Sequence, residues 1–262
     1  MPIQLYQIDS FTQLIFKGNP AGVCFLEKPM SDDWMQNVSL EMNLSETAFI
    51  LPENDAYRLR WFTPEVEVAL CGHATLASAH VLWNYNFLPK DKQARFNTLS
   101  GLLTADYKNG KIELDFPAKP EIETTEFSIL EKVLGAKPIY VGKSQFDVLV
   151  EVENDSIVKN LNIDFALLKT LKIRGLIVTA KSSSSEFDFI SRFFAPAVGV
   201  NEDPVTGSAH CVLATFWNKR LNKNSFHAYQ ASKRGGVIDV ILVGDRVKLS
   251  GYAVTVFKTE LI

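Results

Sequence analysis

Short apolar runs alternate with turn-forming residues along the whole chain, and this pattern predicts a strand-rich protein. In the first half the runs are IQLYQI, AGVCFL, TAFIL, YRLRWF and GLLTADY, and Gly, Pro, Asn and Asp signals separate them. The second half continues with DVLVEVE, RGLIVTA, FDFISRFF, GVIDVILVG and AVTVF. We therefore expect sheets to dominate both halves.

One stretch departs from this pattern. The segment VALCGHATLASAHVLWNYNFL, residues 68–88, has hardly any polar face between Leu76 and Leu82 and predicts a helix. A helix that is apolar all round must be buried, and in a strand-rich unit the covering layer would be a curved sheet.

The chain also contains an internal echo. RWFTPEVEVALCGHATLASAHVLW and RFFAPAVGVNEDPVTGSAHCVLATFW both read Arg, aromatic, Phe, small residue and Pro, followed by a loop and then an apolar helix. The helix glycine follows the arginine by 12 positions in the first copy, Arg60 to Gly72, and by 15 in the second, Arg192 to Gly207. We predict an α+β fold of two similar, pseudo-twofold related domains, each a curved, mostly antiparallel sheet wrapped around a central apolar helix.

The best candidate for a domain boundary is DFPAKPEIE, residues 115–123. Its two prolines and clustered charges interrupt both strand and helix patterns. We place the boundary near Ala118, which gives a first half of 1–118 and a second half that begins at 119.

The starts of the two helices predict an anion site. If they face each other, the cleft collects unpaired backbone N–H groups and two positive helix-dipole ends, which suit a small carboxylate. Gly72 and Gly207 let the backbone approach a ligand closely, and each is followed by a side chain that handles protons or hydrogen bonds, His73 or Ser208. The imidazole is thus placed for chemistry.

Composition narrows the class of protein. The 262 residues are 47% hydrophobic and 22% charged, and the net charge of -3 gives no general attraction to nucleic acid or to an anionic membrane. The N-terminal MPIQLYQIDSF does not resemble a signal peptide, so we expect a cytoplasmic protein, and the longest apolar run is too short to span a membrane. The three cysteines form no metal-binding spacing and predict reduced thiols.

Four strings, GNPAGV, SETAF, FTPEVEVALCGHATLASAHVL and NEDPVTGSAH, resemble the phenazine-biosynthesis-like (PhzF-like) isomerase family. This family shares the diaminopimelate epimerase fold, and the likeness covers nearly the whole chain. It implies two domains with the active site between them, a final strand at 253–262 that returns to the first half, and a second half of 119–252. It also implies a homodimer, no cofactor and no metal.

The resemblance places the catalytic carboxylate on Glu46, in SETAF. In the phenazine-pathway members the matching glutamate removes a proton from one carbon of a cyclic amino-carboxylic acid and returns it to another. Such a base needs a pKa that burial raises toward neutrality, and the residues TAFI that follow Glu46 would supply an apolar setting. The alternative is that Glu46 is a solvated residue at a strand edge.

The remaining polar positions of the family site fall on His73, Asp203 and Ser208. His73 would position the substrate or shuttle the proton, and Asp203 would bind a substrate amine or orient His73. Ser208 would bind the carboxylate together with the N–H groups of Gly207 and Ala209. The alternative is that His73 is a buried, satisfied histidine, that Asp203 and Ser208 cap a helix, and that the glycines serve tight turns.

Cys71 bears on a second mechanism, because epimerases of this fold use two facing cysteines as acid and base. Cys71 occupies the first of these positions, but the second helix entrance, EDPVTGSA, has no cysteine. A two-thiol racemase is therefore disfavoured, and we expect Cys71 to be a small buried residue that packs in the core.

Three functions stay open from the sequence. The favoured one is a cofactor-independent isomerase that moves a proton within a small carboxylate-bearing substrate. The others are a non-catalytic ligand- or protein-binding module and an epimerase or racemase. No G-x-S-x-G, G-x-x-x-x-G-K-[ST] or G-x-G-x-x-G motif is present to support hydrolysis or nucleotide binding.

Overall fold

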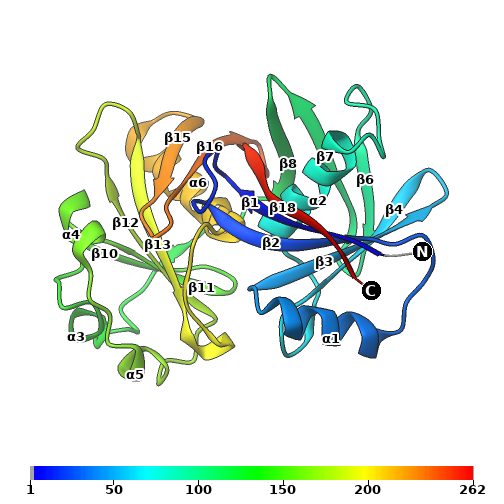
Figure 1. Cartoon of the computed structure of the whole chain (residues 1–262). Coiled ribbons are helices and arrows are strands. Elements are labelled where there is room, and N and C mark those ends of the chain that lie inside the picture. The colour runs from blue at the N-terminus through cyan, green and yellow to red at the C-terminus, as the bar shows by residue number, and fades with distance from the viewer. Residues whose placement is uncertain (1–2, 262) are drawn as a thin grey trace. The chain divides into compact units, whose positions relative to one another are not determined.

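The computed structural model describes residues 3–261, which form two compact units (Figure 1). The first unit contains the residues up to Asp115 together with those from Ser250 onward, and the second contains Phe116–Leu249. That these units fold independently, with the boundaries predicted at 118 and 252, stays a prediction that limited proteolysis can test.

The sheet of the first unit is mostly antiparallel, as predicted. Its strands pair in the order β18-β1-β2-β3-β4-β6-β7-β8, and β5 adds to β4. The pairs β2–β3 and β4–β6 are parallel, so each needs a crossover, which α1 and α2 supply. The bounds are β1 Ile3–Ser10, β2 Asn19–Phe25, α1 Asp32–Met42, β3 Glu46–Glu53, β4 Ala56–Phe62, β5 Glu67–Val68, α2 Gly72–Asn84, β6 Ala94–Thr98, β7 Gly101–Lys108, β8 Lys111–Pro117 and β18 Ala253–Leu261.

Helix α2 is the buried apolar helix that the sequence predicts. It packs against β1, β2, β3 and β18, and its side chains are buried around the whole circumference. Its polar side chains bond within the helix, because Thr75 Oγ1 donates to the Cys71 carbonyl and Ser78 Oγ donates to the Ala74 carbonyl. No hydroxyl of these two residues is therefore left unsatisfied inside the core.

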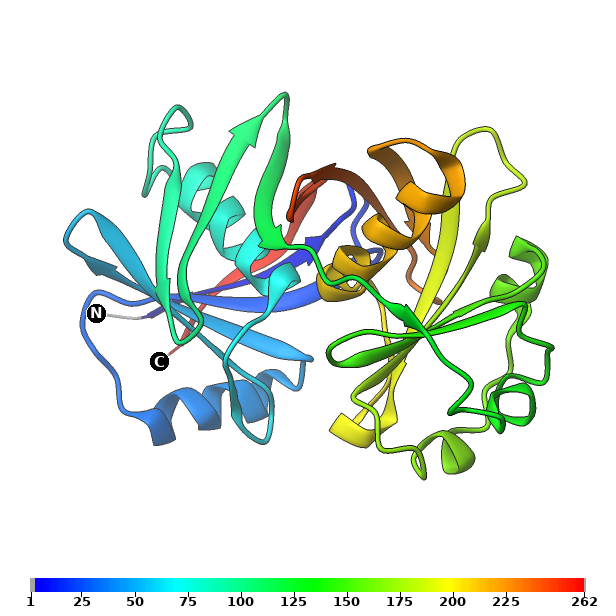
Figure 2. The same ribbon diagram turned by 180° about the vertical axis from the view of Figure 1, so that it is seen from behind.

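The second unit repeats the arrangement around α6 (Figure 2). Its pairings run β9-β10-β11-β12-β13-β15-β16, and β14 adds to β13. The bounds are β9 Ile122–Glu123, α3 Leu130–Leu134, β10 Tyr140–Lys143, β11 Asp147–Glu151, α4 Asp155–Asn160, α5 Phe165–Leu168, β12 Gly175–Lys181, β13 Phe189–Ala195, β14 Val200–Asp203, α6 Gly207–Leu221, β15 Ser225–Gln230, β16 Gly236–Val243 and β17 Arg246–Gly251, with a short 3-10 helix at Pro196–Val198.

The two units share one topology, which confirms the internal echo. The parallel pairs β2–β3 and β4–β6 of the first unit correspond to β11–β12 and β13–β15 of the second. The antiparallel pairs that flank them correspond as well, so that β3–β4–β5 matches β12–β13–β14. In both units the apolar helix follows the short third strand of this series.

The echoed arginine has the same contacts in both units. Arg60 binds both carboxylate oxygens of Glu67 at 2.7 Å, and its guanidinium lies over the ring of Phe62. Arg192 binds Glu202 at 2.6 and 3.0 Å and lies over its own neighbouring phenylalanine in the same way. Each arginine thus ties a long strand to the short strand that leads to the helix, and so fixes the helix entrance.

Candidate active site

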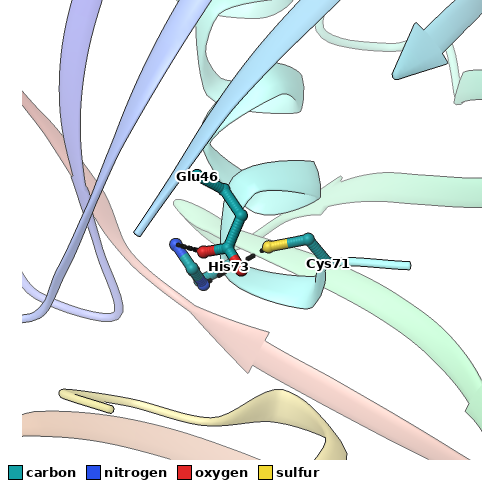
Figure 3. Close-up of side chains that lie close together, drawn as sticks. All are labelled: Glu46, Cys71 and His73. Carbon is teal, nitrogen blue, oxygen red and sulfur yellow. Dashed lines mark hydrogen bonds and ion pairs between the residues drawn. The ribbon is translucent and has the colours of Figure 1, made fainter. Parts of the chain in front are cut away.

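Three side chains converge at the start of α2 in the first unit (Figure 3). Glu46 is the first residue of β3, Cys71 is the N-cap of α2, and His73 is the second residue of α2. The parallel pairing of β2 with β3 begins at Glu46, so the strand delivers this side chain at the same end as the helix entrance. The sequence predicted Glu46 and His73 for one site, and the structure brings them together.

The imidazole of His73 bridges the other two side chains. Its Nε2 atom lies 3.4 Å from Glu46 Oε2, and its Nδ1 atom lies 3.5 Å from Cys71 Sγ. Ser45 Oγ is also 3.4 Å from Nε2. Ser10 Oγ donates a 2.8 Å hydrogen bond to the His73 carbonyl, which anchors the backbone of this first helical turn. His73 is only 5% exposed, so its ring has little freedom to turn away.

The Glu46 carboxyl group is desolvated. Burial raises its pKa, and hydrogen bonds with Ser45 and Cys71 oppose this shift only in part. Its side chain is 20% exposed, and Oε2 is fully covered and accepts no hydrogen bond from the described residues. Glu46 is therefore not a solvated strand-edge residue. A poorly solvated oxygen with an unfilled lone pair is what proton abstraction requires.

Glu46, Cys71 and His73 also form a group that could hold a metal ion, since their donor atoms lie within 4.8 Å of one another. Zinc accepts carboxylate, thiolate and imidazole ligands. However, the thiol lies at one nitrogen of the imidazole and the carboxylate at the other, and a single ion can bind only one of them. The arrangement suits the passing of protons along the ring more directly than chelation.

In the second unit the predicted residues gather at the start of α6. Asp203 ends β14, and its Oδ2 atom accepts a 2.5 Å hydrogen bond from Thr206 Oγ1. Gln230 holds this loop, because its side chain donates to the Asp203 carbonyl and accepts from the Thr206 backbone N–H, both at 2.8 Å. Ser208 is the second residue of α6, after Gly207, and Thr206 is the N-cap. Neither Asp203 nor Ser208 is the helix cap that the alternative interpretation required.

Two features of the sites were missed from the sequence. Cys71 is buried as expected, but it contacts the reactive groups instead of serving only as core packing. In the second unit, Arg174 donates to Ser208 and to both carboxylate oxygens of Asp147. Asp147 gave no signal, because an Asp that opens a strand is common in turns.

Comparison with known proteins gives the family. The model of the phenazine biosynthesis-like protein family matches residues 8–259. The chain belongs to this PhzC-PhzF family. Two relatives named uncharacterized isomerases are similar to it: one from Halalkalibacterium halodurans is 54% identical and covers 100% of this chain and 99% of the relative, and one from Pseudomonas aeruginosa is 47% identical and covers 98% and 97%.

Solved structures agree with this membership. A PhzF-family protein from Enterococcus faecalis has a TM-score of 0.96 at 41% identity, with 100% of both chains covered. A probable proline racemase from Agrobacterium radiobacter shares the fold alone, with a TM-score of 0.64 at 12% identity. This PhzF-family protein therefore has the fold of the isomerase and epimerase superfamily. None of its described helices is both long and apolar enough to cross a membrane.

Proposed function

We propose that this PhzF-family protein is a cofactor-independent isomerase that moves a proton within a small carboxylate-bearing substrate, with Glu46 as the acid/base group. One observation carries the proposal: Glu46 Oε2 is covered, accepts no hydrogen bond from the described residues, and belongs to a carboxyl group whose pKa is raised. Burial brings the pKa of a carboxylate closer to the working pH, where general acid/base catalysis is most effective.

The proposed reaction uses one group twice. The Glu46 carboxylate takes a proton from a carbon of the substrate, and the electron pair left behind delocalises into the adjoining unsaturated system. The protonated Glu46 then returns the proton to a second carbon, so that the bonds of the substrate shift and no atom is gained or lost. His73 Nε2, 3.4 Å from Oε2, keeps the carboxyl group oriented between the two transfers.

A two-base epimerase is less well supported by the same contacts. Inversion at one carbon needs an acid and a base on opposite faces of the substrate. Cys71 hydrogen-bonds to Glu46 and lies beside His73, so the thiol and the carboxylate would approach a substrate from the same side. A single proton shuttle fits this clustering better.

The second half supplies the binding groups in this proposal. Asp203 would bind a polar substituent such as an amine, and Ser208 would bind the carboxylate with the N–H groups of Gly207 and Ala209. We carry forward from the sequence that the substrate lies between the two helix starts and that the protein acts as a cytoplasmic homodimer. Gel filtration with light scattering would test the dimer.

Exchange in deuterated water tests the reaction. The wild-type protein is incubated with cyclic and enolisable amino-carboxylic acids, chosen after mass spectrometry of any small molecule that purifies with it. We expect deuterium to enter, or isomerisation to occur, at defined carbons with wild type and with Glu53→Gln, a control on the same strand whose carboxylate binds Arg58 at the surface. Glu46→Gln should do neither.

The outcomes separate the three functions. Loss of exchange in Cys71→Ser but not in Glu46→Gln would replace this mechanism with thiol-based epimerisation. Tight binding of such acids with no exchange in any of them would favour the binding module.

A further inference from the structure

The second unit contains a set of hydrogen-bond donors next to Ser208. Arg174 Nη2 donates to Ser208 Oγ at 3.1 Å, and Arg174 Nε donates to Asp147 Oδ1 at 2.8 Å. Nη2 also bonds the second oxygen of Asp147. The Asp147 side chain is 2% exposed whereas that of Arg174 is 38% exposed. A buried carboxylate therefore fixes one edge of the guanidinium, and the rest of the group reaches the surface.

Strand register places this set at the position that corresponds to the Glu46 site. The parallel pair β2–β3 opens with Ala21 opposite Glu46, and β11–β12 opens with Asp147 opposite Gly175. Gly175 thus matches Glu46. By the same count Arg174 matches Ser45, and Ser208, which follows the first glycine of its helix, matches His73. The contact of Arg174 with Ser208 is the counterpart of the contact of Ser45 with His73.

Packing explains why no carboxylate occupies the matching position in the second unit. A Cβ atom on Gly175 would lie 2.2 Å from Phe193 Cζ and 3.1 Å from Asp147 Oδ1. Any side chain here would collide with the ring, so the site that holds the proton-transfer group in one unit is filled by an aromatic side chain in the other. What remains around it is a cation and a hydroxyl group, which donate hydrogen bonds.

The guanidinium keeps one edge unoccupied. Nε and Nη2 make the bonds described above, while Nη1 makes none with any residue in the described part of the chain. The rings of Phe146 and Phe193 lie 5.2 and 5.9 Å from the guanidinium carbon, so aromatic groups contact the cation. A guanidinium that is held in one plane, with free N–H groups at its edge, matches the geometry of a carboxylate.

We propose that Arg174 and Ser208 bind a carboxylate of a small ligand, through the Nη1 edge of the guanidinium and the serine hydroxyl. Asp147 already cancels one unit of the positive charge, so a singly charged carboxylate suits the site better than a doubly charged phosphate. This inference rests on the proposed function for the identity of the ligand as substrate. It divides the work of the duplicated motif: the first copy transfers the proton, and the second copy recognises the anion.

Titration of the full-length, ¹⁵N-labelled protein with acetate at constant ionic strength tests the proposal. The signals to follow are Arg174 Nε–H and the backbone N–H of Ser208. We expect saturable shifts in wild type, and an apparent Kd weakened by about tenfold or more in Arg174→Lys, which keeps the charge but loses the planar fork. Ser208→Ala should also weaken binding, and inorganic phosphate should compete poorly with acetate.

Arg220 offers a matched control. Its Nη2 atom lies 2.9 Å from Glu151 Oε2, and its guanidinium lies about as close to two aromatic rings, those of Tyr140 and Phe216, at 5.0 and 4.9 Å. It belongs to the last turn of α6, whereas Ser208 is in the first turn. Arg220→Lys should leave the Kd for acetate unchanged, and thermal unfolding of every variant should show that the fold is retained.

The proposal is overturned if wild type gives no saturable shift at these groups, if both Arg174→Lys and Ser208→Ala bind acetate like wild type, or if phosphate binds more tightly than acetate. This result is separable from the isomerase proposal, because Glu46→Gln should still bind acetate while it loses proton exchange. Exchange that persists with an unchanged KM in Arg174→Lys would overturn the anion site and leave the isomerase intact.

Discussion

Replacement of Glu46 by glutamine should make the folded protein more stable at neutral pH while it abolishes proton exchange. The carboxylate is held in a desolvated position with one oxygen that accepts no hydrogen bond from the described residues. Burying a charge without full compensation costs free energy, and a neutral amide of the same shape avoids that cost.

The size and pH dependence follow from the direction of the pKa shift. Burial raises the pKa of Glu46 above its unfolded value of about 4.5, so between the two pKa values the native state binds more protons than the unfolded state. Stability of the wild type therefore falls as pH rises through this window. For each unit by which the pKa is raised, Glu46→Gln should gain about 1.4 kcal/mol above the window and nothing below it.

Calorimetry of wild type, Glu46→Gln and Glu53→Gln from about pH 4 to 8 measures this difference. Each kcal/mol should raise Tm by about 2–4 °C for a protein of this size. The Glu53 control should lose stability above the unfolded pKa, because a side-chain hydrogen bond with Asn97 and the neighbouring Arg58 lower its pKa. The same Glu46→Gln protein should lose about 10²- to 10⁴-fold in exchange rate.

A Glu46→Gln protein that is less stable than wild type at pH 8, or whose difference from wild type does not change with pH, would refute this reasoning. Either result would mean that the carboxylate is well solvated or well compensated in the folded protein. Its role as a base with a raised pKa would then have no physical support.

Three further predictions concern other parts of the molecule. Gly175→Ala should destabilise the protein by about 1–3 kcal/mol, since its Cβ atom would meet the Phe193 ring, and an unchanged Tm would contradict this packing. Burial lowers the pKa of His210 to about 4, so stability should be lost as pH falls from about 6.5 toward 4, and His210→Gln should flatten that slope in Tm measurements. Cys71→Ser should keep exchange within about tenfold of wild type, whereas a loss as large as that of Glu46→Gln would make the thiol an essential acid or base.

Local patterns carried much of the fold. An apolar segment without a polar face can only be a buried helix, so α2 was predictable from its own residues. The echoed Arg-aromatic-Phe motif indicated two similar units, and the structure gives its reason in the paired contacts of Arg60 and Arg192. Glu46 and His73 were found through short motifs that keep their order along the chain.

The contacts that define the chemistry were decided only by the tertiary structure. Arg174 meets Asp147 and Ser208, 27 and 34 positions away, because a parallel strand pair and a helix start bring these positions together. The nearness of Cys71 to Glu46 depends likewise on how the entrance of α2 sits against β3. Periodicity encodes which face of an element is buried, but it carries no information about which side chains of separate elements meet. The sequence alone therefore determined the elements and their duplication, and packing decided which copy holds a carboxylate and which holds a guanidinium.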